Sequence, residues 1–195
     1  MFKEFAKLEL HTLPSHTEYF HPENFTDVVT TDSPALQVFT DFHIRPPVTI
    51  DKRELVSKAL EKMKSSQVKA LLVIDDSDDK VVGLIHSAQI LGMKKVQAAQ
   101  DHGINQTEVA VWMLMKPMDS LQVLNYRDLS NARVGHIARI LHEKNLQHLL
   151  VYEVCRNGED MLRGIFSATR ISRQLGIEIG GDHASETIAE ISKRI

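Results

Sequence analysis

An internal repeat constrains the fold of this 195-residue chain more than any other feature. The segment ELVSKALEKMKSSQVKALLVID, from Glu54 to Asp75, is similar to ARVGHIARILHEKNLQHLLVYE, from Ala132 to Glu153. The two segments align without a gap, and their apolar positions fall in the same register. A chain that carries one structural unit twice is expected to pack its two copies together.

Each copy predicts the same order of elements. Apolar residues recur at helical spacing from Leu55 to Met63 and from Val134 to Leu141. Each helix is followed by two short apolar runs joined by a polar turn, DDSDDK or CRNGED, which is typical of a hairpin. The second strand of each hairpin passes directly into another helical segment, HSAQILGMKKVQ or SATRISRQLG. The predicted unit is helix, strand, strand, helix, with strands at Ala70–Ile74, Val81–Ile85, Leu149–Tyr152 and Leu162–Phe166.

The residues of the two hairpins resemble a known family. LLVIDDSDDKVVGLIHSAQIL and LLVYEVCRNGEDMLRGIFSATRI are similar to the two copies of a cystathionine-β-synthase (CBS) domain pair, also called a Bateman module. The resemblance covers about Ser33 to Ile177. It implies an α/β (α+β) fold, a tandem CBS repeat with pseudo-twofold symmetry and two clefts between the copies. In this family, such clefts often bind adenosine compounds.

The resemblance also implies how the chain is divided. We expect an N-terminal extension at 1–32, CBS repeat 1 at 33–100, a linker helix at 101–116, CBS repeat 2 at 117–179 and a C-terminal amphipathic helix at 180–195. The linker helix is predicted in TEVAVWMLM, ended by Pro117. Two prolines in TDFHIRPPVTID favour an extended chain into Val48–Ile50. The corresponding strand of repeat 2 lies near Leu121–Leu124 or near Tyr126–Leu129, and the sequence leaves both open.

The stretch GIFSATRIS suggests an anion site. A strand that passes directly into a helix leaves free backbone N–H groups at the helix start, where the helix dipole favours a negative charge. The family signature places Ser or Thr three residues after the glycine, and Asp six residues after it, to hold phosphate and ribose. Repeat 2 has Ser167 and Arg170 after Gly164, whereas repeat 1 has His86 and Gln89.

These departures weaken ordinary ribose binding. A carboxylate accepts two charge-assisted hydrogen bonds, whereas Gln offers one carbonyl oxygen and Arg offers no acceptor. Arg170 could instead hold a phosphate, and Gln89 could take a ribose hydroxyl. His148 stands where family members often direct His or Arg toward phosphates, while its counterpart in repeat 1 is Ala70. We therefore expect the cleft lined by His148, Ser167 and Arg170 to be the better equipped.

The predicted ligand-binding residues each have a structural alternative. Ser167 could simply cap a helix, His148 could be an ordinary strand residue, and Arg170 could be solvated or paired with a carboxylate. The full predicted set is His148, Ser167, Arg170, Gly164, His86, Gln89, Val48 and Thr49.

Composition excludes several other classes of protein. The 23 Lys and Arg against 26 Asp and Glu give a formal charge of −3, which provides no basic field for nucleic acid. One cysteine, Cys155, cannot form an internal disulfide, and no window holds the roughly 20 apolar residues of a membrane helix. The first residues lack the apolar run of a signal peptide. We expect a soluble cytoplasmic protein that binds neither nucleic acid nor membrane.

Catalytic and metal motifs are not found. The sequence contains no GxGxxG, Walker loop, HExxH or GxSxG, so we expect no enzyme activity and no cofactor. The spacing of His11, His16 and His21 matches no known zinc pattern, and no metal site is expected there.

These observations predict a regulatory module that binds AMP, ADP, ATP or S-adenosylmethionine between its repeats. We also expect a homodimer, by resemblance, and a separate regulated protein. The alternative is a ligand-free interaction scaffold whose nucleotide sites have degenerated. Gln89 and Arg170 are the evidence for that alternative.

Overall fold

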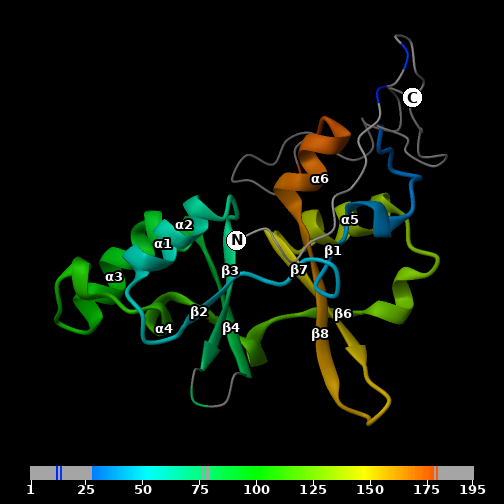
Figure 1. The fold of residues 1–195 in the computed structure, drawn as a ribbon. Helices are drawn as coiled ribbons and strands as arrows, with labels where there is room; N and C mark the ends of the chain where they lie inside the picture. Colours follow the sequence, from blue (N-terminus) through cyan, green and yellow to red (C-terminus); the bar gives the residue numbers. More distant parts are fainter. Residues whose placement is uncertain are drawn as a thin grey trace.

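The computed structural model describes Thr12, Pro14, residues 28–75, Ser77, residues 80–177 and Ile179. Figure 1 shows two halves side by side, each with a sheet and its own set of helices. The helix expected at 180–195 and most of the extension expected at 1–32, including its three histidines, lie outside the described residues.

Both halves have the predicted order of helix, strand, strand and helix. The described chain is a mixed α/β structure with pseudo-twofold repetition, as expected from the sequence. In the first half the elements are β2 (Thr49–Asp51), α1 (Val56–Ser65), β3 (Ala70–Asp75), β4 (Lys80–His86), α2 (Ser87–Leu91) and α3 (Met93–Asp101). In the second half they are β6 (Val123–Asn125), α5 (Val134–Glu143), β7 (His148–Val154), β8 (Asp160–Ser167) and α6 (Ala168–Leu175). The strand of repeat 2 that the sequence left open is β6, close to the first of the two alternatives.

Each sheet is completed by a strand from the segment just before the first helix of the other repeat. The sheets have the orders β2-β3-β4-β5 and β1-β8-β7-β6. Strand β1 (Thr40–Asp41), which lies ahead of the first helix of repeat 1, pairs antiparallel with β8 of repeat 2. Strand β5 (Lys116–Pro117), which lies ahead of the first helix of repeat 2, pairs antiparallel with β4 of repeat 1. We call 40–48 and 116–122 the leading segments. Their exchange interlocks the two halves.

Two glycines make room for the exchanged strands. Gly164 on β8 pairs with Asp41, and a Cβ at Gly164 would overlap the Phe39 ring and the carbonyl oxygen of Thr40. Gly83 on β4 has the same role, because its Cβ would lie 2.5 Å from the carbonyl oxygen of Lys116. The glycine that the sequence placed in a ligand site is therefore required by the close approach of β1.

A cluster of charged side chains fastens β1 to β8. Arg163 donates hydrogen bonds to both carboxylate oxygens of Asp41, at 2.9 and 2.8 Å. It also bonds Glu153 at 2.5 Å, and its guanidinium lies 4.4 Å from the centre of the Tyr126 ring. These contacts lower the pKa of Asp41 and raise that of Arg163. A two-residue strand is thus held by a bidentate ion pair as well as by its backbone.

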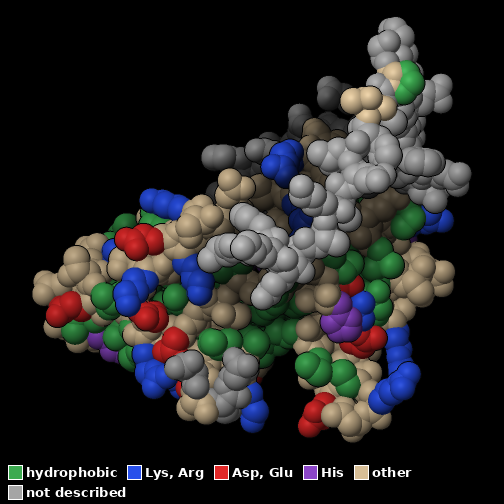
Figure 2. Space-filling model, in the orientation of Figure 1, with side chains coloured by type: hydrophobic (Ala, Val, Ile, Leu, Met, Phe, Trp, Pro, Cys, Tyr) green, Lys and Arg blue, Asp and Glu red, His purple; other side chains and the backbone are tan. Residues whose placement is uncertain are grey.

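Three clusters of buried apolar residues form the core. One lies beneath α5 and α6, and a second lies beneath α1, α2 and α3. The third joins the two sheets through buried Leu72, Leu84 and Leu150. Figure 2 shows hydrophobic side chains gathered between the two halves on this face. We call this third cluster the seam, because it is where the repeats meet.

The expected linker helix is much shorter than predicted. Between α3 and β5 the chain forms a short 3₁₀ turn, η2 (Gln106–Glu108), and the four-residue helix α4 (Val111–Leu114). Val109 is extended instead, and its carbonyl accepts a 3.0 Å bond from the backbone N–H of Val56 at the start of α1. Backbone pairing with repeat 1 thus replaces helical bonds here. No helix in the described part of the chain has the length and apolar character needed to cross a bilayer.

The other short elements are 3₁₀ turns. They are η1 (Ala35–Val38), before β1; η3 (Met118–Ser120), between β5 and β6; and η4 (Tyr126–Leu129), after β6.

Candidate functional site

Two histidines from different repeats meet at one end of the seam. His86 ends β4 and His148 begins β7, and their Nδ1 atoms are 3.0 Å apart. The rings are stacked, with centroids 4.8 Å apart and planes inclined by 20°. In such a contact one Nδ1 must donate a proton and the other must accept it, so the two rings carry different tautomers. The pair joins the repeats through their side chains.

Burial keeps both imidazoles uncharged. Desolvation, with smaller contributions from Lys116 and Lys94, lowers the pKa of His86 to about 4. Desolvation, followed by His86 and Lys69, lowers the pKa of His148 to about 3. The charged groups that act on the pair are therefore lysines, and they create a positive potential around it.

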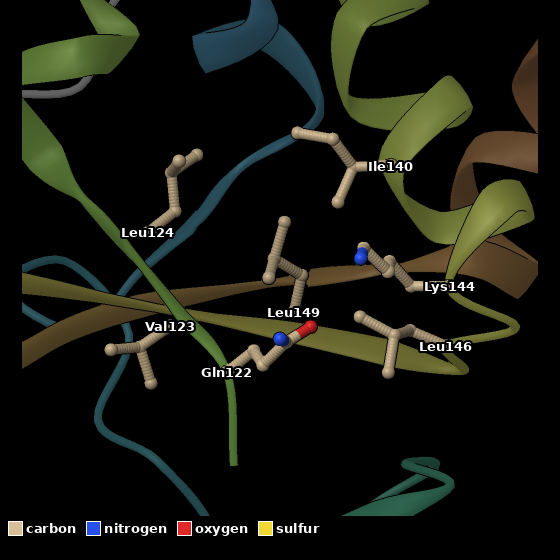
Figure 3. Close-up of a pocket in the computed structure, with 7 residues that line it drawn as sticks. All are labelled: Gln122, Val123, Leu124, Ile140, Lys144, Leu146 and Leu149. Atoms are coloured by element: carbon tan, nitrogen blue, oxygen red, sulfur yellow. The ribbon is translucent and has the colours of Figure 1, made fainter.

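One pocket begins beside His148, and a second pocket adjoins it. The smaller has a volume of about 240 Å³ and includes His148 and residues from both repeats. The larger has a volume of about 390 Å³ and lies between β6 and the end of α5 (Figure 3). Gln122 and Leu146 line both pockets. We call the two together the His148 pocket; its lining is Leu84, Lys116, Ser120, Leu121, Gln122, Val123, Leu124, Ile140, Lys144, Leu146, His148, Leu149 and Leu150.

The walls of the His148 pocket suit a ligand with an apolar ring and a charged end. The larger part is mostly aliphatic, and Figure 3 shows Gln122 and Lys144 bringing an amide and an amine to it. The smaller part adds Lys116, Ser120 and His148. Few polar groups among apolar walls are typical of small-molecule sites, and about 390 Å³ lies within their usual size of roughly 300–1,000 Å³.

Gln89 lies close to the pair but is bonded within the protein. Its side chain is buried; its Nε2 donates to the carbonyl oxygen of Leu114 at 2.6 Å, and its Oε1 accepts from the His86 backbone N–H at 2.8 Å. A ribose hydroxyl at Gln89 would have to replace or share these bonds. Gln89 thus fixes the start of α2 and the end of α4.

Ser167 and Arg170 point in different directions. Ser167 lies directly opposite His148 on the neighbouring strand, and its hydroxyl accepts the Arg170 backbone N–H at 3.4 Å, as a helix cap. The guanidinium of Arg170 instead reaches Thr40 on β1, at 3.0 Å, whereas the His148 pocket lies beside β6 and β7. The structure therefore keeps His148 and Ser167 together and places the Arg170 side chain across β8 from the pocket.

The remaining predicted residues lie away from the His148 pocket. Thr49 begins β2 and pairs with Leu72, and the Val48 carbonyl accepts a 3.1 Å bond from Leu72. Strand β2 is at the opposite edge of its sheet from β5, which contributes Lys116 to the pocket. Val48 and Thr49 therefore do not line the His148 pocket. In the part of the chain that the structure describes, no three His, Cys, Asp or Glu side chains are arranged to hold a metal ion.

Residues 39–94 match the family model of the CBS domain. This chain has the fold of a CBS domain pair. Its second half repeats the same elements and forms the second member of the pair. No curated protein matches the chain.

Three solved structures are similar in fold to this chain. An uncharacterized conserved protein from Pyrococcus horikoshii is 20% identical, with a TM-score of 0.52, over 82% of this chain and 99% of that one. CBSX2, a CBS-pair protein from Arabidopsis thaliana, was solved in complex with AMP; it is 22% identical, with a TM-score of 0.50, over 72% of this chain and 94% of that one. A conserved CBS domain protein of unknown function from Thermoplasma acidophilum is 20% identical, with a TM-score of 0.50, over 79% of this chain and 73% of that one.

Several residues that line the His148 pocket were not predicted from the sequence. Lys116, Ser120 and Gln122 belong to the leading segment of repeat 2, where the prediction placed the end of a helix and an unassigned strand. The prolines before Val48 indicated a leading segment in repeat 1. Extending the internal repeat past Pro117 would have indicated the corresponding leading segment of repeat 2.

Proposed function

We propose that this CBS pair is a regulatory module that binds an adenine nucleotide or a related adenosyl compound in the His148 pocket. The observation that carries the proposal is a pocket between the repeats that contains Lys116, Ser120 and His148 and adjoins an aliphatic pocket within the second half. The complex of CBSX2 with AMP supports it, because that protein has the same fold. AMP, ADP, ATP and S-adenosylmethionine are the candidate ligands.

In the proposed complex the adenine ring lies against the aliphatic walls near Leu146. The side-chain amide of Gln122 offers both a donor and an acceptor, which matches the polar edge of adenine. Lys116 and Lys144 supply positive charge for a phosphate or a carboxylate, and Ser120 supplies a hydroxyl. The proposed role of the pocket is binding, and no catalytic step is assigned to it.

Binding at this place would connect the two repeats. Leu84 and Lys116 belong to the first sheet, whereas Leu121 and His148 belong to the second half. A ligand that contacts both sides more strongly in one arrangement of the halves would shift the protein toward that arrangement. A separate regulated protein, or a second copy of this chain in a homodimer, would respond to that shift.

The test is a thermal-stability panel of the full chain with AMP, ADP, ATP, NADH and S-adenosylmethionine. A ligand at 100 times its dissociation constant is expected to add about 2.7 kcal/mol to the free energy of unfolding. Gln122→Trp, at an exposed position, would fill the junction of the two pockets and remove the response. Gln97→Trp, at an exposed position on α3, is the matched control. An equal response in both variants would place the ligand elsewhere.

A ligand-free scaffold remains the second candidate, and one observation favours it. The direct contact of His86 with His148 already joins the two repeats without a ligand, and the amide of Gln89 is already bonded to His86 and Leu114. On this alternative the module presents a fixed surface to a partner protein. A panel with no response to any of the five compounds would support the scaffold and contradict nucleotide sensing.

A further inference from the structure

The imidazole of His148 has one nitrogen bonded within the protein and one nitrogen open to solvent. Its Nδ1 lies 3.0 Å from Nδ1 of His86, across the contact between the repeats. No described residue bonds its Nε2, whereas every buried polar side-chain atom within the described ranges has a partner. Nε2 is therefore accessible to solvent. Because His148 lines the smaller part of the His148 pocket, a ligand held there can reach this nitrogen.

The hydrogen-bonding state of Nε2 depends on His86. In a neutral imidazole one nitrogen carries the proton and the other is an acceptor. When Nδ1 of His86 donates in the contact, Nδ1 of His148 accepts, and Nε2 of His148 carries the proton. When His148 donates instead, its Nε2 is left as an acceptor. His86, which is not among the residues that line the pocket, thus sets what His148 offers to a ligand.

The ring of His86 is held in place from several sides. His86 ends β4, where it is paired with Ala70, and its backbone N–H donates to the side-chain oxygen of Gln89 at 2.8 Å. The residue is buried, and its ring lies close to that of His148, with the two planes inclined by only 20°. Turning Nδ1 of His86 away would leave a polar atom of a buried ring without a partner. The contact with His148 is therefore the favoured one.

An anionic ligand would select one of the two arrangements. Lys116 lines the same part of the pocket, and none of the described residues that line it carries a carboxylate. A phosphate dianion or a carboxylate only accepts hydrogen bonds, so an N–H at Nε2 stabilises it and a lone pair repels it. The arrangement that fits such a ligand has His86 as the donor at Nδ1 and His148 as the donor at Nε2.

We propose that His86 is a positioning residue for the pocket, which donates to Nδ1 of His148 and so directs the Nε2–H of His148 toward an anionic group of the ligand. The part that concerns the ligand rests on the proposed function, whereas the opposite states of the two Nδ1 atoms do not. A ligand bound beside β7 would in this way also fix the proton on a side chain of repeat 1. The pair would connect the ligand to both halves.

Isothermal titration calorimetry of the full chain with AMP, at about pH 7.5, where unperturbed histidine is already neutral, tests the role of His86. His86→Phe keeps a ring and removes the donor, and it is expected to weaken AMP binding about fivefold, the effect of one neutral hydrogen bond. His86→Asn places an amide nitrogen on Cγ, as Nδ1 is, and is expected to bind AMP within about twofold of the original chain.

Two further variants separate positioning from general damage. His148→Phe is expected to weaken AMP binding, and adding His86→Phe to it should cause no further loss, because His86 acts through His148. The matched control is His102→Phe, which removes an exposed imidazole of repeat 1 and should leave the affinity unchanged. A loss from His86→Phe that persists when residue 148 is already Phe, or an equal loss in His102→Phe, would overturn the proposal.

Nitrogen-15 NMR of the imidazole rings provides a readout that a structural role alone would not change. With AMP bound, we expect His86 to be protonated on Nδ1 and His148 on Nε2. Without ligand, we expect one protonated and one unprotonated Nδ1 in the pair. Two rings that are both protonated on Nε2, or a His148 that is protonated on Nδ1 in the AMP complex, would overturn the proposal.

These measurements distinguish failure of this inference from failure of the proposed function. AMP binding that is equal in the original chain and in His86→Phe would leave nucleotide binding intact and refute the role of His86. No AMP binding, together with opposite states of the two Nδ1 atoms, would refute the proposed function alone, because His86 would still set the state of His148.

Discussion

At the scale of single residues, the contact between His86 and His148 links the protonation of two side chains to the packing of the repeats. The Nδ1 atoms are 3.0 Å apart, which allows one shared proton and disfavours charge on both rings. Lys69, Lys94 and Lys116 oppose protonation further. The folded protein therefore keeps both rings neutral in a range where unfolded histidines take up protons.

This difference predicts a loss of stability in acid. Between pH 6.5 and about 4, the unfolded chain binds protons at His86 that the folded chain does not, so the free energy of unfolding falls as the pH falls. One pKa unit corresponds to about 1.4 kcal/mol, so His86 alone would contribute a loss of about 3 kcal/mol, with His148 adding to it. The full stability is present above pH 6.5.

Urea denaturation from about pH 7.5 to about pH 4.5 measures this dependence. The double variant His86→Phe with His148→Phe keeps two stacked rings and removes both protonation sites, so its stability should vary much less over the same range. A His142→Ala variant on α5 is the control and should follow the original chain. An unchanged slope in the double variant would contradict the argument.

At the scale of elements, the exchanged strands β1 and β5 depend on glycine at the point of contact. A side chain at Gly164 has no space, because β1 occupies the position of its Cβ. Arg163 and Asp41 hold the same strand from the side. Strand β1 is only two residues long, so its stability depends mainly on these contacts.

Gly164→Ala is therefore expected to lower the free energy of unfolding by about 3 kcal/mol, since overpacking of a close contact typically costs about 1–3 kcal/mol. Gly103→Ala is the control. Its φ of +64° makes alanine unfavourable, but no atom lies within 4 Å of the added Cβ, so the expected loss is about 1 kcal/mol. Thermal and urea denaturation give both values. Equal losses in the two variants would mean that β1 does not need the space above Gly164.

At the scale of the whole molecule, the seam and the exchanged strands make each half depend on the other. The sheet of repeat 1 takes β5 from the segment before the first helix of repeat 2, and the sheet of repeat 2 takes β1 from the segment before the first helix of repeat 1. Leu72, Leu84 and Leu150 are buried by the contact between the two sheets. Neither half can complete its sheet or cover its seam alone.

Calorimetry is therefore expected to show one cooperative unfolding transition, with equal calorimetric and van't Hoff enthalpies. Leu150→Ala at the seam should lower its midpoint without splitting it, at a cost of about 2–5 kcal/mol. Two separate transitions, or a Leu150→Ala variant that unfolds only its own half, would refute this coupling.

The sequence predicted the parts of this fold that are local. The helices and hairpin strands of both repeats follow apolar periodicity, and all of them are present. Strand β1 could not be found this way, because it has only two residues and pairs with β8, and Arg163, which binds the Asp41 side chain, lies 122 positions away in the sequence. Long sequence separation also explains which of the predicted binding residues lie together. His148 and Ser167 are neighbours within one hairpin, whereas the contact of Arg170 with Thr40 spans 130 positions and redirects the guanidinium.

The exchange of β1 and β5 also bears on how such a chain could arise. A shorter ancestor with one repeat would lack a strand unless two chains traded their leading segments, which makes an intertwined pair of identical chains its natural form. Joining the two genes places both partners in one polypeptide and frees each copy to change independently. His86 and Gln89 in one repeat, where the other has Ser167 and Arg170, are the kind of divergence that such a fusion permits.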